Sequence, residues 1–181
     1  MPHLDRGALQ PAAVATTAER LQVLLDTAEI HRMLMTYLRA VDRCDIDLLA
    51  SVYHDDARDE RGPHVHTGGR EIAEDIVARI TTTSRMSTHT MCNELIEVSG
   101  NLARSECYCM AYLILPRPEG DHLRHFAGRY LDRWERRNDD GWRIAHRRVI
   151  LEWGEIRPLQ EQDPAWVRFT RGERSAADPS Y

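Results

Sequence analysis

The chain has 181 residues, 42% of them hydrophobic, so it can bury one core but is short for two ordinary domains. Its 24 basic and 29 acidic side chains leave a net charge of -5, which offers no footprint for a phosphate backbone, and we expect no nucleic-acid partner. No apolar run approaches the roughly 20 residues that span a bilayer, and residues 1–10 lack the basic-then-apolar order of a signal peptide. We therefore expect a cytoplasmic protein without a membrane partner.

The first regular element is an amphipathic helix. Thr16 with Glu19, and Asp26 with Glu29, both have the spacing of a capping box. The second pair introduces apolar residues at helical intervals and predicts a helix over about 27–42. The residues that carry this periodicity are Ile30, Leu34, Leu38 and Val41.

Two shorter helical patterns follow. The first covers residues 45–52 and is broken by the polar segment 54–62. The second covers residues 70–80, behind a Gly-Gly pair, with isoleucines four residues apart. The pattern therefore predicts three helices before any long strand.

After Thr83 the hydrophobic period changes to two, and turn signals divide the rest of the chain into four long strands. Hairpin-length links between them predict an antiparallel meander. Helices followed by strands are the order of an α+β domain, in which helices cover one face of a curved sheet. The predicted strands are Thr88–Val98, Ala103–Leu115, His122–Arg136 and Trp142–Trp153.

The chain divides into three parts on this basis. Residues 1–15 have no sustained period and are expected to form a flexible N-terminal arm. Residues 16–155 form the folded domain, and 156–181 form a tail with a short helix. The aromatic residues Trp166 and Phe169 of this helix need a surface to cover, either on the parent domain or on a second subunit.

Four short segments together resemble the SnoaL-like branch of the NTF2-like superfamily over about residues 24–155. They are Tyr37–Asp42, Thr88–Thr90, Gly128–Tyr130 and Gly141–His146. The resemblance implies an α+β NTF2-like cone, in which a strongly curved, mostly antiparallel sheet wraps around N-terminal helices and leaves a deep pocket. It also implies a homodimer or homotrimer. Functions vary widely across this superfamily, so the fold alone does not determine the chemistry.

Within the superfamily, the chain is most similar to elimination enzymes of the scytalone dehydratase, lindane dehydrochlorinase and bile-acid dehydratase type. These use a histidine base that an aspartate from the first long helix orients. By position the aspartate corresponds to Asp42, the histidine to His89 and the tyrosine of the dehydratase to Tyr37. Arg147 lies near a position that is arginine in the dehydrochlorinase-like group, whereas the later arginine of the bile-acid enzyme falls on Leu151.

The pattern around Asp42 and His89 is consistent with this assignment. Asp42 follows Leu38 by four residues, which places a carboxylate on the apolar stripe of the helix, where it needs donors. The alternative is a solvent-facing acid at the end of a helix. His89 opens the first long strand on the same face as Met91. A carboxylate on one imidazole nitrogen would fix the tautomer of a general base; the alternative is a core histidine bonded to a backbone carbonyl.

Two further groups complete the candidate site. The hydroxyl of Tyr37 could donate to a leaving group, or the residue could be a half-buried core tyrosine. Alternation along the strands places a set of apolar side chains on the face of a pocket for a ring-containing substrate, although such residues are also ordinary core. The set comprises Met91, Cys107, Cys109, Phe126, Tyr130, Val149, Leu151 and Trp153.

A metal site is the less favoured interpretation. His64 with His66, and His122 with His125, invite it, but neither pair has carboxylate ligands at fixed spacing. A metal-dependent hydrolase that uses His54, His64 and His66 is therefore only a third hypothesis. The four cysteines are too sparse for a disulfide-stapled domain, and we expect free thiols.

The leading hypothesis is a cofactor-independent lyase or isomerase that acts on a small hydrophobic or aromatic substrate. His89 removes a proton from an activated carbon, Asp42 orients His89, and Tyr37 or Arg147 assists the departing group. The alternatives are a non-catalytic subunit that binds a hydrophobic ligand or serves in assembly, and a polyketide-cyclase-like enzyme.

Overall fold

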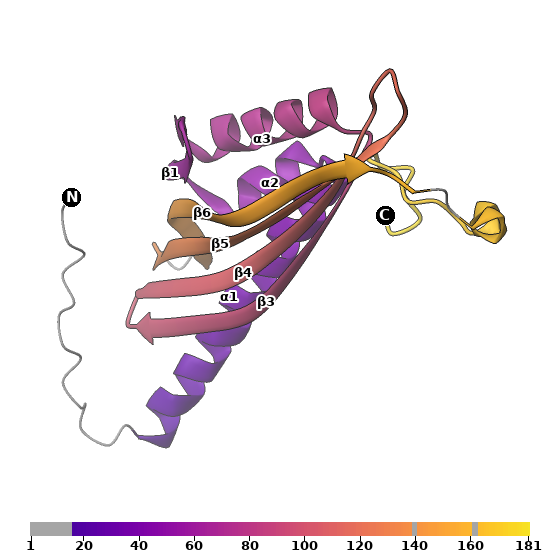
Figure 1. Cartoon of the computed structure of the whole chain (residues 1–181). Coiled ribbons are helices and arrows are strands. Elements are labelled where there is room, and N and C mark those ends of the chain that lie inside the picture. Colours follow the sequence, from indigo (N-terminus) through magenta and orange to yellow (C-terminus); the bar gives the residue numbers. More distant parts are fainter. Residues whose placement is uncertain (1–15, 139–140, 161–162) are drawn as a thin grey trace.

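The structure, a computed structural model, describes residues 16–138, 141–160 and 163–181, so the predicted N-terminal arm lies outside the described residues. The predicted α+β fold is confirmed: a curved six-stranded sheet packs against helices on its concave face (Figure 1). The elements are α1 (Thr17–Arg43), α2 (Ile46–Ser51), β1 (Tyr53–Arg61), β2 (His64–Thr67), α3 (Gly69–Thr83), β3 (Met86–Ser99), β4 (Leu102–Leu115), β5 (His122–Arg136), β6 (Trp142–Pro158) and the 3₁₀ helix η1 (Pro164–Arg168).

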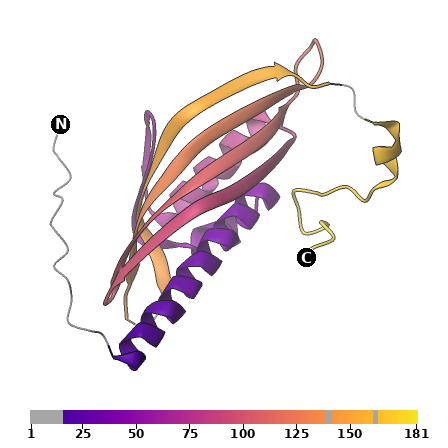
Figure 2. The same ribbon diagram turned by 60° about the horizontal axis from the view of Figure 1, so that its bottom comes forward.

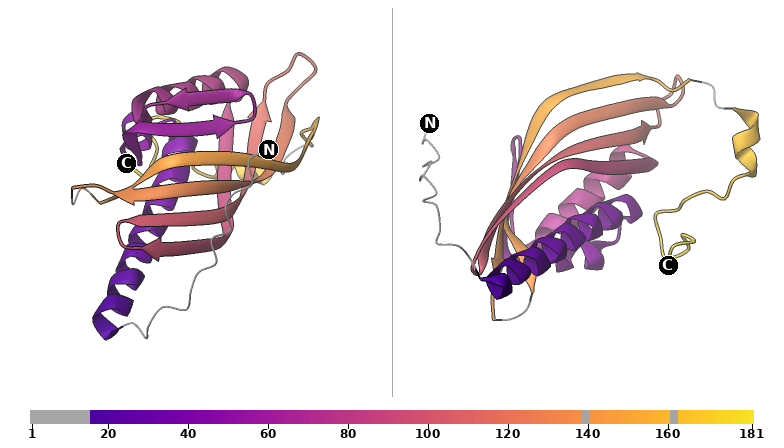
Figure 3. Two further views of the ribbon diagram at one scale, coloured as in Figure 1. Left: turned by 90° about the vertical axis from the view of Figure 1, so that its left-hand side faces the viewer. Right: turned by 90° about the horizontal axis from the view of Figure 1, so that it is seen from below.

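The sheet has the strand order β2-β1-β6-β5-β4-β3. The predicted antiparallel meander forms its larger part, from β3 to β6. β1 adds to β6 in the parallel direction, and β2 pairs with β1 as a hairpin. The long strands arch over α1, while α2 and α3 lie behind α1 on the same concave side (Figures 2 and 3).

The polar segment 54–62 does end the second helix, but the prediction that three helices precede any long strand is wrong, because most of this segment forms β1, which comes before α3. The strand is hard to recognise since two of its inward residues are charged: Asp59 is 2% exposed and Arg61 is partly buried beside it. Because Asp59 and Arg61 occupy inward positions, the segment lacks the alternation of apolar and polar residues that would indicate a strand, and Ala57 alone does not indicate one. The element order is consequently two helices, a hairpin and then α3, rather than three helices in succession.

Helix α1 begins ten residues earlier than the predicted start near residue 27. The first capping box is the one that forms, since the side chains of Thr16 and Glu19 each accept from the backbone of the other. Asp26, the supposed second cap, lies inside the helix and is 3% exposed. Its carboxylate accepts from Arg136 and from the indole Nε1 of Trp142, which is 3.1 Å away, so it joins α1 to the ends of β5 and β6.

Cross-strand partners point to the same face of an antiparallel sheet, so the register arranges the concave face in rows. One end of the sheet is closed by Trp134 and Trp142, which are 0% and 1% exposed. From these tryptophans, successive rows lead along the strands toward the β4–β5 hairpin, which lies at the opposite end of the sheet; we call this the open end. The next row is Ser105, Asp132, Arg147 and Asp59; after it come Cys107, Tyr130, Val149 and Arg61; and further out lie His89, Ala111 and Phe126.

The tail contains the predicted short helix as η1, capped by Asp163. Its aromatic residues Trp166 and Phe169 are 51% and 69% exposed in this structure. Beyond η1 the chain returns to the body, where Arg174 donates to the carbonyl oxygen of Ser84 at 2.6 Å. Within the residues that the structure describes, no helix is both long and apolar enough to cross a membrane.

Replacement of Asp26 by alanine should lower the free energy of unfolding by about 1–3 kcal/mol, because Arg136 and Trp142 lose a shared buried acceptor. Urea denaturation measures the change. Glu119→Ala is the control, since Glu119 is an exposed acid whose carboxylate lies 3.8 Å from Nε2 of His122, and we expect a change within about 0.5 kcal/mol. Equal effects of the two substitutions would contradict a structural role for Asp26.

Candidate active site

His89 and Asp42, which are far apart in sequence, meet at the edge of the sheet. His89 Nδ1 lies 2.6 Å from Asp42 Oδ1, and the backbone N–H of His89 donates to Asp42 Oδ2 at 2.8 Å. The side chains are 9% and 13% exposed, respectively. One carboxylate thus holds both the ring and the backbone of the same histidine.

The secondary structure explains why this contact forms. β3 is an edge strand, so backbone N–H groups on its outer side have no strand partner, and Asp42 satisfies that of His89. Asp42 lies in the last turn of α1, where the helix dipole disfavours an anion. The two N–H donors of His89 compensate for that dipole.

The same contact assigns the tautomer of His89. A carboxylate only accepts, so Nδ1 carries the proton and the lone pair of Nε2 is left free. No residue in the described part of the chain hydrogen-bonds to Nε2, and the ring lines a pocket. In the neutral form of His89, Nε2 is therefore the ring nitrogen that can accept a proton, and the residue that carries it lines the pocket.

The pocket has a volume of about 380 Å³ and lies between α3 and the concave face of the sheet. Its surface combines aliphatic and aromatic side chains with one imidazole, one phenol and three guanidinium groups. The lining residues are Arg61, Ile76, Arg79, Ile80, Thr83, His89, Ala111, Leu113, Arg124, Phe126, Tyr130 and Val149. A ring-containing molecule matches its size and its largely apolar wall.

The structure brings only some of the predicted lining residues to this pocket. Phe126, Tyr130 and Val149 lie in its wall. Cys107 and Cys109 are 0% exposed within the core beneath it, and the thiol of Cys109 donates to the hydroxyl of Tyr130 at 3.2 Å. Met91 packs against the same core and is not among the lining residues.

Leu151 and Trp153 lie outside the pocket and are 63% and 52% exposed. For Trp153 the cause is a β-bulge: Gly128 faces Leu151 but Ala127 faces Trp153, so one residue of β6 has no partner and the alternation reverses after Leu151. Trp153 consequently lies on the convex face of the sheet, where its ring packs edge to face with that of His125, with the ring centres 4.8 Å apart. Strict alternation along β6 could not predict this reversal.

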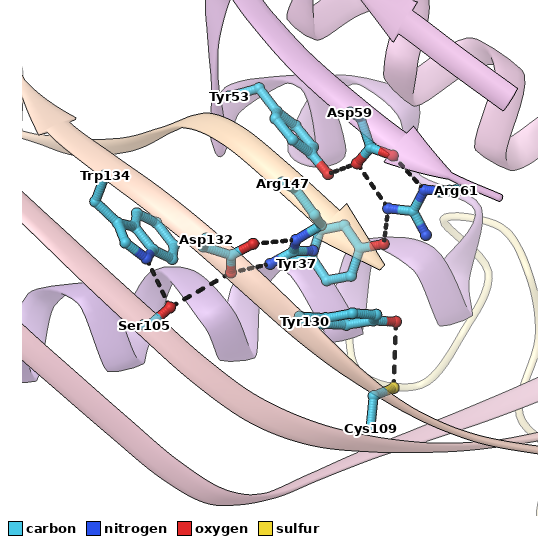
Figure 4. A network of polar contacts seen from close by, with 10 residues as sticks. All are labelled: Tyr37, Tyr53, Asp59, Arg61, Ser105, Cys109, Tyr130, Asp132, Trp134 and Arg147. Atoms are coloured by element: carbon cyan, nitrogen blue, oxygen red, sulfur yellow. Dashed lines mark hydrogen bonds and ion pairs between the residues drawn. The ribbon is translucent and has the colours of Figure 1, made fainter. Parts of the chain in front are cut away.

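Tyr37 and Arg61 belong to a buried polar network that Figure 4 shows. The guanidinium of Arg61 donates to both oxygens of Asp59, at 2.6 and 2.9 Å, and to the hydroxyl of Tyr37 at 2.9 Å. Burial would raise the pKa of Asp59, but Arg61 holds it below its ordinary value. Arg61 reaches the pocket wall, whereas Tyr37 is 1% exposed and lies behind it.

Arg147 and Asp132 form a second buried pair (Figure 4), in the row of the sheet next to that of Tyr130 and Val149, which line the pocket. Both side chains are 0% exposed, and two hydrogen bonds of 2.7 Å join them. The guanidinium carbon lies 4.1 Å from the ring centre of Tyr37 and 4.4 Å from that of Tyr130. Arg147 is not among the pocket-lining residues; Tyr130 separates it from the pocket.

Three arginines of the pocket were not predicted from the sequence, namely Arg61, Arg79 and Arg124. Arg61 was not predicted because the pattern of residues 53–61 does not indicate a strand. Arg79 lies between Ile76 and Ile80 of α3; the spacing of these isoleucines predicts a helix with an apolar face but does not indicate that Arg79 faces a pocket. Arg124 alternates with Phe126 along β5, and this spacing is the one signal that would have placed it in the pocket.

The histidines of the metal hypothesis lie apart. His54 Nε2 is 2.9 Å from the carbonyl oxygen of Glu135, and His66 contacts Glu71 and Asp75 on α3. In residues 16–138, 141–160 and 163–181, no group of three or more histidine, cysteine or acidic side chains is arranged to hold a metal ion.

Truncation of Asp132 tests the importance of the ion pair beneath the pocket. Asp132→Ala should lower the free energy of unfolding by about 3–5 kcal/mol, because Arg147 is left as an uncompensated buried charge. The double variant Asp132→Leu with Arg147→Met should recover most of the loss. Glu155→Ala removes an exposed pair with Arg157 and should cost about 0–1 kcal/mol; a similar value for Asp132→Ala would show that the pair is dispensable.

The core thiols should resist alkylation. Burial raises the pKa of Cys107 to about 12, and it also raises the pKa of Cys109, so neither forms an appreciable thiolate at pH 8. Mass spectrometry after iodoacetamide treatment should find both peptides unmodified in the folded protein and modified in urea. Rapid modification of Cys107 without denaturant would contradict the closed core.

Comparison with solved structures places the fold among dehydrochlorinases and dehydratases. A type-2 hexachlorocyclohexane dehydrochlorinase has 21% identity and a TM-score of 0.71, over 80% of this chain and 98% of that chain. A type-3 dehydrochlorinase from Novosphingobium barchaimii has 22% identity and a TM-score of 0.69, over 80% and 99%. A putative scytalone dehydratase from Novosphingobium aromaticivorans has 20% identity and a TM-score of 0.67, over 80% and 96%. At these identities the similarity establishes the fold.

No curated protein matches this sequence significantly. The SnoaL-like domain family does match, over residues 22–148, which include most of α1, the entire hairpin of β1 and β2, and most of the sheet. This span covers well over half of the chain and contains both His89 and Asp42. The protein therefore belongs to the SnoaL-like domain family of the NTF2-like superfamily.

Proposed function

We propose that the chain is a cofactor-independent lyase or isomerase for a small, hydrophobic, ring-containing substrate. One observation carries the proposal: His89 lies in the wall of the pocket, with Nδ1 held by Asp42 and Nε2 free. A base of this kind needs an oriented ring, a fixed tautomer and access to substrate; the contact with Asp42 supports the first two, and the position of His89 in the pocket wall supports the third.

In the proposed step, Nε2 of His89 takes a proton from a carbon that a neighbouring carbonyl or ring system activates. The carbon–hydrogen bond breaks, and its electron pair forms a carbon–carbon double bond. In a lyase the leaving group departs with the electron pair of its own bond, whereas in an isomerase the imidazolium returns the proton to another carbon. Asp42 stabilises the imidazolium in both cases.

Tyr130 and Arg61 are the donors best placed to assist the departing group or a developing oxyanion. The hydroxyl of Tyr130 accepts from Cys109, which leaves its own hydrogen for the pocket. Burial raises the pKa of Tyr130, so the phenol stays protonated. In this proposal Tyr37 and Arg147, the two assisting residues predicted from the sequence, position Arg61 and Tyr130 from behind and do not touch the substrate.

The structural neighbours favour the lyase over the isomerase. Dehydrochlorinase and scytalone dehydratase both denote eliminations, and both proteins share the fold of this chain. The proposal also includes a homodimer or homotrimer, since apolar side chains such as Trp153, Ile156 and Phe169 are about half exposed or more. The competing function is a subunit that binds a hydrophobic ligand without converting it.

Loss of the base tests the proposal. The enzyme is incubated in D₂O with small cyclic ketones that carry halide, hydroxyl or no substituent β to the carbonyl, and NMR follows deuterium incorporation and product formation. His89→Ala and Asp42→Asn should each reduce the rate with an active ketone by about 10²–10⁴-fold, the usual contribution of a general base.

The matched control is His31→Ala. His31 forms a similar contact with an acid, 2.8 Å from Glu94, but it is 52% exposed and does not line the pocket. This variant should retain the wild-type rate. Unchanged turnover in Asp42→Asn would overturn the role of the pair, and absence of both exchange and elimination across the panel, with ligand binding intact, would favour the binding subunit.

A further inference from the structure

The pocket that contains His89 carries an excess of positive charge. Arg61, Arg79 and Arg124 all line it, and among its described lining residues there is no aspartate or glutamate. An apolar pocket for a neutral ring has no need of three guanidinium groups. Their presence indicates that part of the ligand is negatively charged.

Two of these arginines already have acidic partners. Arg61 is paired with Asp59, and Nη2 of Arg79 lies 2.6 Å from Asp75. Arg124 differs, because its guanidinium makes no hydrogen bond or ion pair with any residue in the described ranges. The pocket therefore retains one guanidinium whose donors are available to a ligand.

The sheet register fixes where this guanidinium lies relative to the base. Arg124 is two residues from Phe126 on β5, and Phe126 is in register with Ala111, which in turn faces His89. On a flat sheet, two strand spacings and two residues separate the Cα atoms of Arg124 and His89 by roughly 12 Å. Curvature brings inward side chains closer, so a single ring system can reach from one side chain to the other.

Building on the proposed function, we infer that the substrate is a ring carboxylate: Arg124 binds the carboxylate at the open end of the pocket while the reacting carbon meets His89. The carboxylate is remote from the carbon that loses its proton, so its negative charge does not oppose formation of the carbanion-like transition state.

A carboxylate is preferred over a phosphate for reasons of charge and geometry. A single uncompensated guanidinium balances one negative charge, and its planar fork of donors matches the two oxygens of a carboxylate. A phosphate dianion would require a second free cation or a cradle of backbone N–H groups. Arg61 and Arg79 do not provide that cation, since their charges are already balanced by Asp59 and Asp75.

Calorimetric titration of the full chain tests this inference without any knowledge of the natural substrate. The probes are 2-naphthoate and its uncharged analogue 2-naphthamide, which share the same ring. Wild-type protein should bind the carboxylate about 10- to 100-fold more tightly than the amide, the increment expected for a charge-assisted hydrogen bond. Arg124→Gln should abolish this preference, and Arg124→Lys should retain part of it.

Arg133→Gln is the matched control, because it removes the same charge from β5 but on the convex face, where Arg133 is 57% exposed. This variant should preserve the preference for the carboxylate. His89→Gln should preserve it as well, even though it abolishes proton removal, so failure of the base and failure of the anion site are separate results.

Equal affinity of wild-type protein for the two probes, or binding of neither at millimolar concentration, would overturn the inference; both results come from the wild-type chain and do not depend on the folding of a variant. Persistence of the preference in Arg124→Gln would overturn the assignment to Arg124. Displacement of 2-naphthoate by millimolar inorganic phosphate would show a phosphoryl site instead of a carboxylate site.

Discussion

Asp132 and Arg147 carry opposite charges on side chains that are both 0% exposed. Removing two ions from water costs several kcal/mol each, so the layer they form is stable only with the paired geometry observed. The pair also positions its neighbours. The rings of Tyr37 and Tyr130 pack against the guanidinium of Arg147, and the indole Nε1 of Trp134 donates to the hydroxyl of Ser105 at 2.8 Å. Because Tyr130 rests on Arg147, this layer sets the depth of the pocket above it.

Helix α1 is attached to the sheet near both of its ends. Near its start Asp26 attaches it to β5 and β6, and near its end Asp42 attaches it to the free edge of β3. The edge of a curved sheet would otherwise present unpaired N–H groups. The carboxylate that closes this edge is also the one that orients His89, so the candidate catalytic geometry and the closure of the sheet depend on the same contact.

Much of the fold follows from sequence periodicity, because most of its elements bury apolar stripes. The limits of β5 are predicted to the residue, and those of β4 to within one. Prediction fails where inward residues are charged or where one residue breaks the alternation: β1 buries Asp59 and Arg61, and the bulge in β6 turns Trp153 outward. The contact of His89 with Asp42 was expected only through family resemblance. Arg79 and Arg124 were missed because long cationic side chains read as surface on a helix or strand.

The layered interior has a consequence for how such a protein can change over evolutionary time. Substitutions in the buried charged layer of Asp132 and Arg147, beneath Tyr130, affect the stability of the fold. Substitutions on α3 and in the outer rows of β4 and β5 alter only the shape and charge of the pocket wall. Selection can therefore exchange one ligand for another in the upper rows while the lower layer stays fixed. A lineage built on this plan can diversify in chemistry at little risk to its architecture.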